Sequence, residues 1–251
     1  MNAERTFAVA APWGAGLTIV ILAMSVLLRL GTRIDAGEAV SILPSGLEVG
    51  ARIAHRVAAM SVGILAAAVL VAAALARPAT RSRLVVATSV AALTLVLALI
   101  GRYTPGYRID AVTVVNVTGG LALVAAFWWL RATPASAGRA VHALAVAALL
   151  VLLALSATGA AGAAAAMRGA HAFGAPHLGL AAIFALLACV IVWRARRRAA
   201  FAVLALALLQ LVLGLAMLSV PDAGSLVLGW AHAMLACALA LPLVSLARPT
   251  A

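Results

Sequence analysis

The sequence predicts an all-α integral membrane protein of eight transmembrane helices, built as two parallel four-helix repeats. Hydrophobic residues make up 67% of the 251 residues and charged residues only 10%, whereas about a quarter of the residues in soluble domains are charged. The apolar segments are about twenty residues long, which is the length that a helix needs to cross a bilayer. Because lipid offers no hydrogen bonds to the backbone, segments of this length form helices.

Charged residues and turn residues separate the apolar stretches. The breaks contain Pro, Gly and clustered arginines, such as Arg77-Pro78 and Arg194 to Arg198, and these residues end or interrupt helices. The expected spans are 9–30, 54–76, 84–101, 111–130, 141–160, 177–193, 200–219 and 225–246. We expect the first span to be a retained helix, because no small-residue cleavage site marks it as a signal peptide.

The distribution of arginine predicts the orientation. All 18 basic residues are arginines, and the segments on the N-terminal side of the membrane hold only one of the six acidic residues, Glu4. The arginines on that side are Arg5, Arg77, Arg81, Arg83, Arg131, Arg139, Arg194, Arg196, Arg197, Arg198 and Arg248. The positive-inside rule therefore predicts a multi-pass protein of the cell (inner) membrane with both termini in the cytoplasm.

The isoelectric point near 11.8 also raises the question of nucleic-acid binding. No basic stripe with interleaved aromatic residues lies outside the loops, so we expect no nucleic-acid partner and expect membrane lipid instead.

An internal repeat divides the chain into halves. An offset of 116 residues carries a proline, and Asn116 eleven positions later, onto a proline and His232 without a gap. Upstream, the histidine that opens the second span matches the histidine that opens the sixth, at an offset of 122. We therefore expect an N-half, 1–133, and a C-half, 134–251, related by an axis along the membrane normal.

Two of the five histidines are expected at similar depth in the C-half. His177 opens the sixth span, and His232 lies about two turns into the eighth. Imidazoles on neighbouring helices can bind the iron of a six-coordinate heme from opposite sides. Alternatively, both rings are hydrogen-bonded to backbone carbonyls at a helix interface. Position alone leaves both interpretations open.

The N-half carries a partial copy of this pattern. His55 is the counterpart of His177 and is followed by Arg56, which would pair with a heme propionate or extend toward lipid head groups. Asn116 occupies the position of the second ligand and is a poor ligand for iron. A heme here would have one histidine, which means either an open coordination position or a site that has lost its heme.

The remaining candidate residues have simpler interpretations. His142 is expected to be a solvated helix-end residue and His171 a loop residue near the sixth span. Cys189 and Cys237 lie inside apolar segments, where cysteine usually packs as a small hydrophobe. The tryptophans near the predicted helix ends are expected to be interfacial anchors; they are Trp128, Trp129, Trp193 and Trp230.

Taken together, these residues resemble the heme A synthase family of cytochrome oxidase assembly proteins. The resemblance rests on the His-Arg pair at the second span and on residues 206–232, where a Leu-Val-Leu-Gly helix and a Pro turn precede Trp230-Ala231-His232. It implies that His177 and His232 are the iron ligands of heme b. It also implies that His55 belongs to the half where the methyl group of heme O is oxidised to the formyl group of heme A.

The sequence departs from the family pattern in three ways. Asn116 replaces the second histidine of the N-half. The family's glutamate one turn before the first histidine falls at Arg52, and the nearest acid is Glu48, which we consider with His55 as a candidate catalytic residue. The cysteine pair often found in the first outer loop is missing from 31–53. The first two departures concern the half in which the family performs its chemistry.

Two functions remain open. The first is a divergent heme A synthase that takes heme O and forms heme A. The second is a non-catalytic member that holds heme b and acts as an electron-transfer or assembly subunit of a respiratory complex, or receives electrons from a donor protein. A cofactor-free transporter is a weaker third interpretation, since no discontinuous helix or buried acidic pair is predicted at mid-depth.

Overall fold

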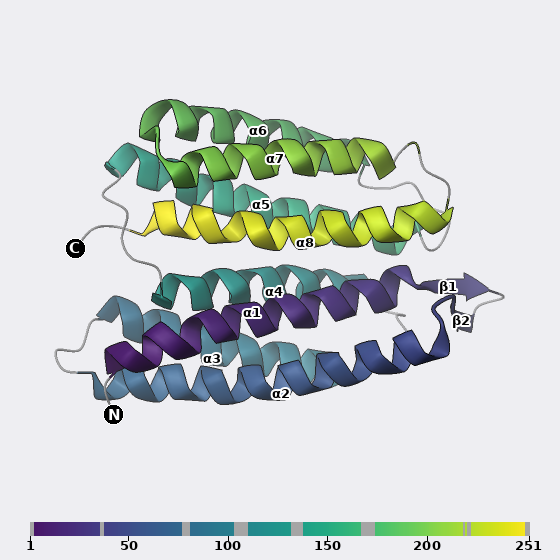
Figure 1. Cartoon of the computed structure of the whole chain (residues 1–251), viewed down its shortest axis with the longest axis horizontal. Coiled ribbons are helices and arrows are strands. Elements are labelled where there is room, and N and C mark those ends of the chain that lie inside the picture. The colour runs from purple at the N-terminus through teal and green to yellow at the C-terminus, as the bar shows by residue number, and fades with distance from the viewer. Residues whose placement is uncertain are drawn as a thin grey trace.

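Eight long helices lie side by side in the computed structural model (Figure 1). The structure describes residues 3–35, 38–76, 81–102, 110–131, 138–166, 174–217, 219 and 222–248. The elements are α1 (Ala3–Leu30), β1 (Thr32–Asp35), β2 (Glu38–Ser41), α2 (Ser45–Leu75), α3 (Arg81–Arg102), α4 (Asp110–Arg131), α5 (Arg139–Ala166), α6 (Gly174–Ala195), α7 (Arg198–Met217) and α8 (Asp222–Ala247). Within the described residues, all eight helices are long and apolar enough to cross a membrane. The all-α membrane fold predicted from the sequence is confirmed.

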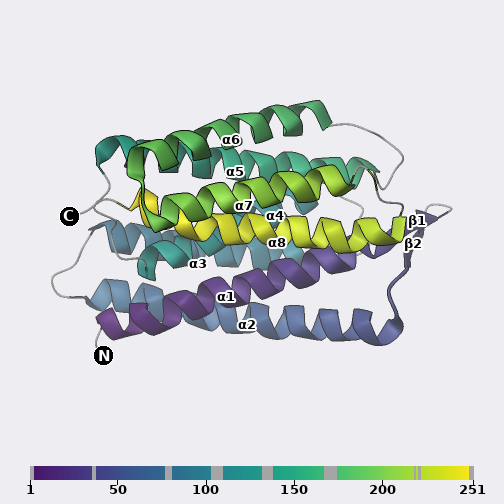
Figure 2. The ribbon, with the colours of Figure 1, turned by 45° about the horizontal axis from the view of Figure 1, so that its top comes forward.

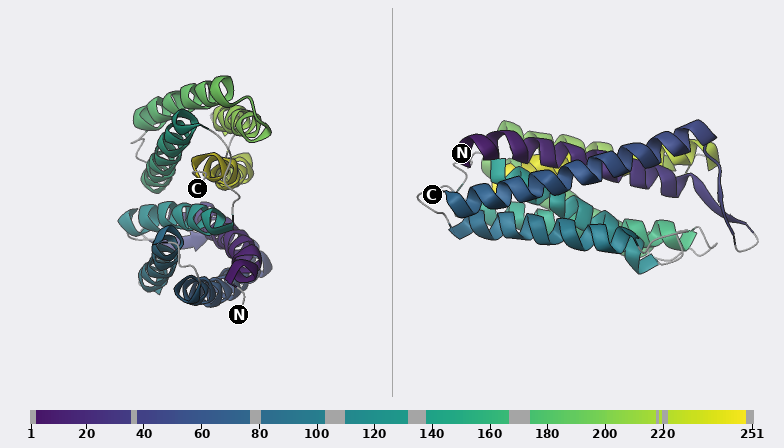
Figure 3. Two further views of the ribbon diagram at one scale, coloured as in Figure 1. Left: turned by 90° about the vertical axis from the view of Figure 1, so that its left-hand side faces the viewer. Right: turned by 90° about the horizontal axis from the view of Figure 1, so that it is seen from below.

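The helices form two groups of four, α1–α4 and α5–α8, which the view along the helices shows (Figure 3, left). In the C-half, α5 and α7 each pack against both α6 and α8, so α6 and α8 are diagonal partners. In the N-half, α2 and α4 are diagonal in the same way. The two groups meet where α1 and α4 pack against α5 and α8, and we call this surface the seam.

The two ends of the molecule differ. Both termini lie at one end, which we call the termini end, and the short β-hairpin lies at the opposite, hairpin end (Figure 2). The hairpin is antiparallel, with Thr32 opposite Ser41, and it was not expected from the sequence. Two strands of four residues around a Gly-containing turn give only a weak sequence signal for a hairpin. The apolar spans on either side dominate the pattern.

The second helix begins at Ser45, nine residues before the predicted start at 54. Because Glu48 and Arg52 are charged, the sequence pattern predicts a loop here. In the structure they form an ion pair one turn apart, and pairs at this spacing stabilise a helix. His55 therefore lies nearly three turns inside α2 rather than at its start.

One pattern of buried positions recurs on the four even-numbered helices, α2, α4, α6 and α8. The residues seven, eleven and fourteen positions after His55, Asn116, His177 and His232 are buried in every copy. They are Val62, Ala66, Val69, Leu123, Phe127, Leu130, Phe184, Ala188, Ile191, Leu239, Leu243 and Leu246. Because this spacing selects one face of a helix, the three histidines and Asn116 occupy equivalent positions on the four even-numbered helices.

The outward faces of the helices carry large apolar side chains. Ile64 on α2 is 71% exposed and Leu186 on α6 is 65% exposed within the isolated chain. Exposed apolar surface on this scale is unfavourable in water, so lipid is its natural surrounding. The chain is therefore a multi-pass membrane protein in contact with membrane lipid.

Candidate functional site

His177 and His232 approach each other inside the C-half. They come from the diagonal helices α6 and α8, and their ring centres are 6.3 Å apart with the ring planes inclined by 50°. A metal–imidazole bond is about 2 Å long and the ring nitrogen lies about 1.1 Å from the ring centre, so imidazoles on opposite sides of one ion have centres about 6 Å apart. The observed separation fits a shared metal ion.

Each of the two rings lies against a glycine of the preceding helix. A Cβ atom on Gly159 of α5 would be 3.3 Å from Cε1 of His177, and one on Gly214 of α7 would be 3.4 Å from Cε1 of His232. Glycine inside a helix costs roughly 0.5–1 kcal/mol relative to alanine. Two such glycines, each eighteen residues before its histidine, reserve the space that the imidazoles occupy.

The two hairpins of the C-half match each other at an offset of 55 residues. This offset carries Gly159 onto Gly214 and His177 onto His232. It also relates six pairs of buried core residues: Ala145 and Ala200, Ala148 and Val203, Leu152 and Ala207, Phe184 and Leu239, Ala188 and Leu243, Ile191 and Leu246. The space between the two rings thus lies between two equivalent hairpins, which suits a group bound from both sides.

A hydrogen bond fixes the orientation of one ring. The Thr158 hydroxyl lies 3.0 Å from His177 Nδ1 and donates to the carbonyl of Ala154, also at 3.0 Å. A hydroxyl has one proton to donate, so it accepts from Nδ1–H of His177. That tautomer leaves Nε2 with a free lone pair, which is the form of imidazole that binds metal.

The His232 ring has no threonine in the corresponding position. The position equivalent to Thr158 is Leu213, and His232 Nδ1 is buried without a hydrogen-bond partner in the described part of the chain. Gln210, whose backbone is close to the His232 ring, also has a buried Oε1 atom without a partner there. Buried polar atoms are nearly always satisfied in folded proteins, so an unpaired ring nitrogen on His232 is unusual and agrees with a polar function for the site.

The surrounding donors restrict the kind of metal group. Among the described residues, no group of three or more His, Cys, Asp or Glu side chains is placed to hold a bare metal ion. Two imidazoles leave the other coordination positions of a metal unfilled. A heme supplies these ligands from its own porphyrin ring. His177 and His232 therefore fit a heme iron better than a bare metal ion.

The N-half holds its polar residues differently. His55 Nδ1 lies 3.2 Å from the backbone carbonyl of Ile21 on α1. Asn116 is half-buried on α4, and no hydrogen bond joins it to His55 among the described contacts. The buried residues Phe7, Ala11 and Thr18 of α1 match Val141, Ala145 and Leu152 of α5 at an offset of 134 residues. The same offset places Ser25 at the position of Gly159, and Ala98, eighteen residues before Asn116, stands at the position of Gly214, so neither position holds a glycine in the N-half.

A buried arginine is the N-half feature that sequence reasoning missed. Arg29 is 9% exposed and donates from Nη1 to the carbonyl of Thr113 at 3.1 Å, which joins α1 to α4. It lies within electrostatic range of His55, as does the exposed Arg56. The contact spans 84 residues of sequence, and no local pattern reveals it. A cation at membrane depth is usually functional.

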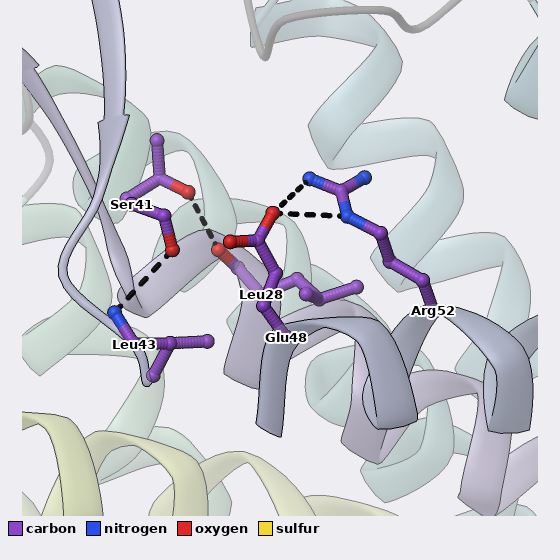
Figure 4. Close-up of polar contacts among 6 residues, drawn as sticks. Leu28, Ser41, Leu43, Glu48 and Arg52 are labelled. Atoms are coloured by element: carbon purple, nitrogen blue, oxygen red, sulfur yellow. Dashed lines mark hydrogen bonds and ion pairs between the residues drawn. The ribbon is translucent and has the colours of Figure 1, made fainter. Parts of the chain in front are cut away.

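The Glu48 carboxylate forms an ion pair with Arg52 on its own helix (Figure 4). Its Oε1 atom accepts from Arg52 Nε at 3.0 Å and from Arg52 Nη2 at 2.6 Å. His55 lies seven residues further along α2, about 10 Å along the helix axis. The structure does not bring Glu48 and His55 together.

The remaining candidates lie apart from these sites. His142 lies in the first turn of α5 as expected, but it is half-buried rather than solvated, because its Nδ1 atom is covered and has no partner in the described part of the chain. His171 lies outside the described residues. Trp230 donates from Nε1 to the Ala23 carbonyl across the seam at 3.0 Å. Cys189 is exposed and Cys237 buried, and both are free thiols.

Comparison with known proteins adds no family to this description. No model of a protein family matches the sequence, and no curated protein matches it significantly. The fold and the paired histidines define a multi-pass helical membrane protein with a candidate metal-group site in its C-half.

Proposed function

We propose that this chain is a heme-binding membrane protein of the heme A synthase type, whose C-half holds heme b between His177 and His232. The observation that carries the proposal is the pair of imidazoles from diagonal helices, 6.3 Å apart, each against its own glycine. The resemblance of residues 206–232 to that family, stated above, agrees with it.

The protein supplies three things to such a heme. His177 and His232 would be its axial ligands, the glycines give the rings room, and Thr158 keeps Nε2 of His177 unprotonated. A heme b with two histidine ligands supplies one-electron redox chemistry.

Within this type, the N-half favours a non-catalytic role over heme A formation. Asn116 replaces an iron ligand, Glu48 is paired with Arg52, and the positions of both glycines hold larger residues. We therefore propose that the chain works as a heme b electron-transfer or assembly subunit of a membrane respiratory complex. Its partners would be that complex or an electron-donor protein docked at the helix ends.

Heme A formation is the second candidate, and one observation favours it. His55 has buried Arg29 and exposed Arg56 within electrostatic range, and two guanidinium groups suit the propionates of a substrate heme. In that case His55 would hold heme O as the substrate, and conversion of its methyl group to the formyl group of heme A would require an external oxidant.

For the membrane, we propose the cell (inner) membrane with both termini in the cytoplasm. The argument is the excess of arginine at the termini end, where Glu4 is the single acidic residue of the sequence.

A heme inventory of the purified protein tests the proposal. We expect heme b at about one per chain, measured by the pyridine hemochrome spectrum and by chromatography of the extracted heme. Heme O or heme A in the extract, together with rescue of a host that lacks its own heme A synthase, would favour the second candidate. A protein expressed in heme-replete cells and free of heme would overturn both.

A further inference from the structure

Two arginines lie over the rings of two adjacent tryptophans at the termini end of the seam. The guanidinium carbon of Arg131 is 5.1 Å from the centre of the Trp128 ring, and that of Arg248 is 4.9 Å from the centre of the Trp129 ring. A cation–π contact of this kind holds a guanidinium group near the ring, and its N–H groups can still donate hydrogen bonds to an anion.

The tryptophans are held in place across the seam. Trp128 lies in the last turn of α4 and donates from Nε1 to Ser245 Oγ of α8 at 3.2 Å. Ser245 in turn donates to the carbonyl of Leu241 at 3.0 Å. Arg131 is the last residue of α4, and Arg248 directly follows α8. The cluster therefore joins the N-half to the C-half at the ends of these two helices.

Within the described residues, Glu4 is the one carboxylate whose charge reaches Arg248. Glu4 is the one acid of the sequence on this side, and it is paired with Arg83, which also covers the ring of Phe7. Burial, and next the charge of Arg83, lower the pKa of Arg248. Neither Arg131 nor Arg248 has an ion pair within the described part of the chain.

We propose that Arg131 and Arg248, held by Trp128 and Trp129, bind the phosphate head group of an anionic phospholipid at the termini end of the seam. Tryptophans at helix ends lie at the level of the lipid head groups, and basic clusters between transmembrane helices bind anionic lipids. A bound head group would neutralise the cluster and link α4 to α8. This site is independent of the proposed heme.

The test uses the full-length protein in neutral detergent. Mixed micelles containing phosphatidylglycerol, micelles containing phosphatidylcholine, and inorganic phosphate are added separately. Thermal unfolding and the lipids retained in native mass spectrometry are then measured. We expect phosphatidylglycerol to raise the unfolding temperature by a few degrees and to be retained, and the other two additions to have little effect.

The test variant is R131Q/R248Q, and the matched control is R194Q/R198Q. The control removes the same charge from the same end, and its Arg194 stacks on a tryptophan as well, with the guanidinium carbon 4.9 Å from the Trp193 ring centre. Because Arg131 and Arg248 would contact the head group directly, whereas Arg194 and Arg198 would add only general surface attraction, we expect retention in the test variant to be about 30-fold weaker than in the control, which corresponds to about 2 kcal/mol.

Three outcomes would overturn the proposal. The two double variants could lose lipid equally, which would mean general charge attraction. Inorganic phosphate could stabilise the protein as strongly as lipid, which would mean an anion site that does not select lipid. Phosphatidylcholine could be retained equally, which would remove the role of charge. If R131Q/R248Q does not fold, R131K/R248K keeps the charge without the planar stacking, and we expect intermediate retention.

Discussion

Gly159 on α5 approaches the His177 ring on α6 so closely that an added Cβ would lie 3.3 Å from Cε1. That distance is shorter than ordinary van der Waals contact, so the ring and the helix backbone set each other's positions. The same relationship recurs 55 residues later between Gly214 and His232. At Gly214 the added Cβ would lie 3.4 Å from Cε1, at the limit of ordinary contact, so the fit is tighter at His177 and leaves little room for a larger side chain at either position.

Leucine at position 159 should displace the His177 ring and reduce heme content. Overfilling a packed site costs typically 1–3 kcal/mol, which corresponds to about a 5- to 150-fold loss of affinity. The measurement is heme per chain in Gly159→Leu. Its control is Gly179→Leu on α6, where an added Cβ meets nothing within 4 Å. Equal heme content in both variants would contradict a role for Gly159 in placing the ring.

Alanine at either paired histidine should remove the low-spin heme b spectrum. His177→Ala and His232→Ala each delete one axial ligand, and the remaining imidazole would give a high-spin five-coordinate heme or none. Optical and electron paramagnetic resonance spectra measure this change. His142→Ala is the control, because His142 is also a half-buried histidine of the C-half but lies near the termini end. An unchanged low-spin spectrum in both ligand variants would rule out this heme site.

Valine at position 158 should raise the midpoint potential of the heme. The Thr158 hydroxyl accepts from His177 Nδ1–H, which makes the imidazole a stronger donor and favours ferric iron. Losing a hydrogen bond of about 0.5–1.5 kcal/mol corresponds to a rise of roughly 20–60 mV for one electron. Redox titration of Thr158→Val measures the shift, and Thr158→Ser should keep the original potential. A shift of equal size in the serine variant would argue against the hydrogen bond as its cause.

Cysteine labelling from either side of the membrane should settle the orientation. Val40, on the hairpin, is 47% exposed, and a cysteine there should react with a membrane-impermeant maleimide added to intact cells. The background is Cys189→Ser, because Cys189 is exposed whereas Cys237 is buried. Labelling only after the cells are opened would reverse the proposed topology.

The eight helices could be predicted because length and apolar composition decide which segments cross a bilayer. The start of α2 could not, because Glu48 and Arg52 look like loop charges until their pairing along one helix is seen. The eighteen-residue spacing of glycine and histidine is readable from the sequence. It gains meaning only when the distance between His177 and Gly159 is known.

Contacts between distant segments set the limit of sequence reasoning at the two candidate sites. The buried Arg29 meets α4 through a carbonyl 84 residues away, and any residue can provide a backbone carbonyl. The pairing of His177 with His232 was a hypothesis from helix order alone. Their separation required the tilt and packing of α6 and α8, which apolar periodicity does not determine.

The equivalence of the four hairpins predicts how a second heme site could be built in the N-half. Asn116→His alone would supply the missing imidazole, but Ser25 and Ala98 stand where the C-half has glycines. We therefore expect Asn116→His to leave the heme content near one per chain, and the triple variant with Ser25→Gly and Ala98→Gly to bring it toward two. Pyridine hemochrome analysis per mole of protein measures this ratio, with Ser25→Gly and Ala98→Gly without the histidine as the control.

If the single variant bound a second heme as well as the triple variant did, the glycines would not be what separates the two halves. If neither variant gained heme, His55 and position 116 would not face a common space, and the N-half would differ from the C-half by more than its side chains.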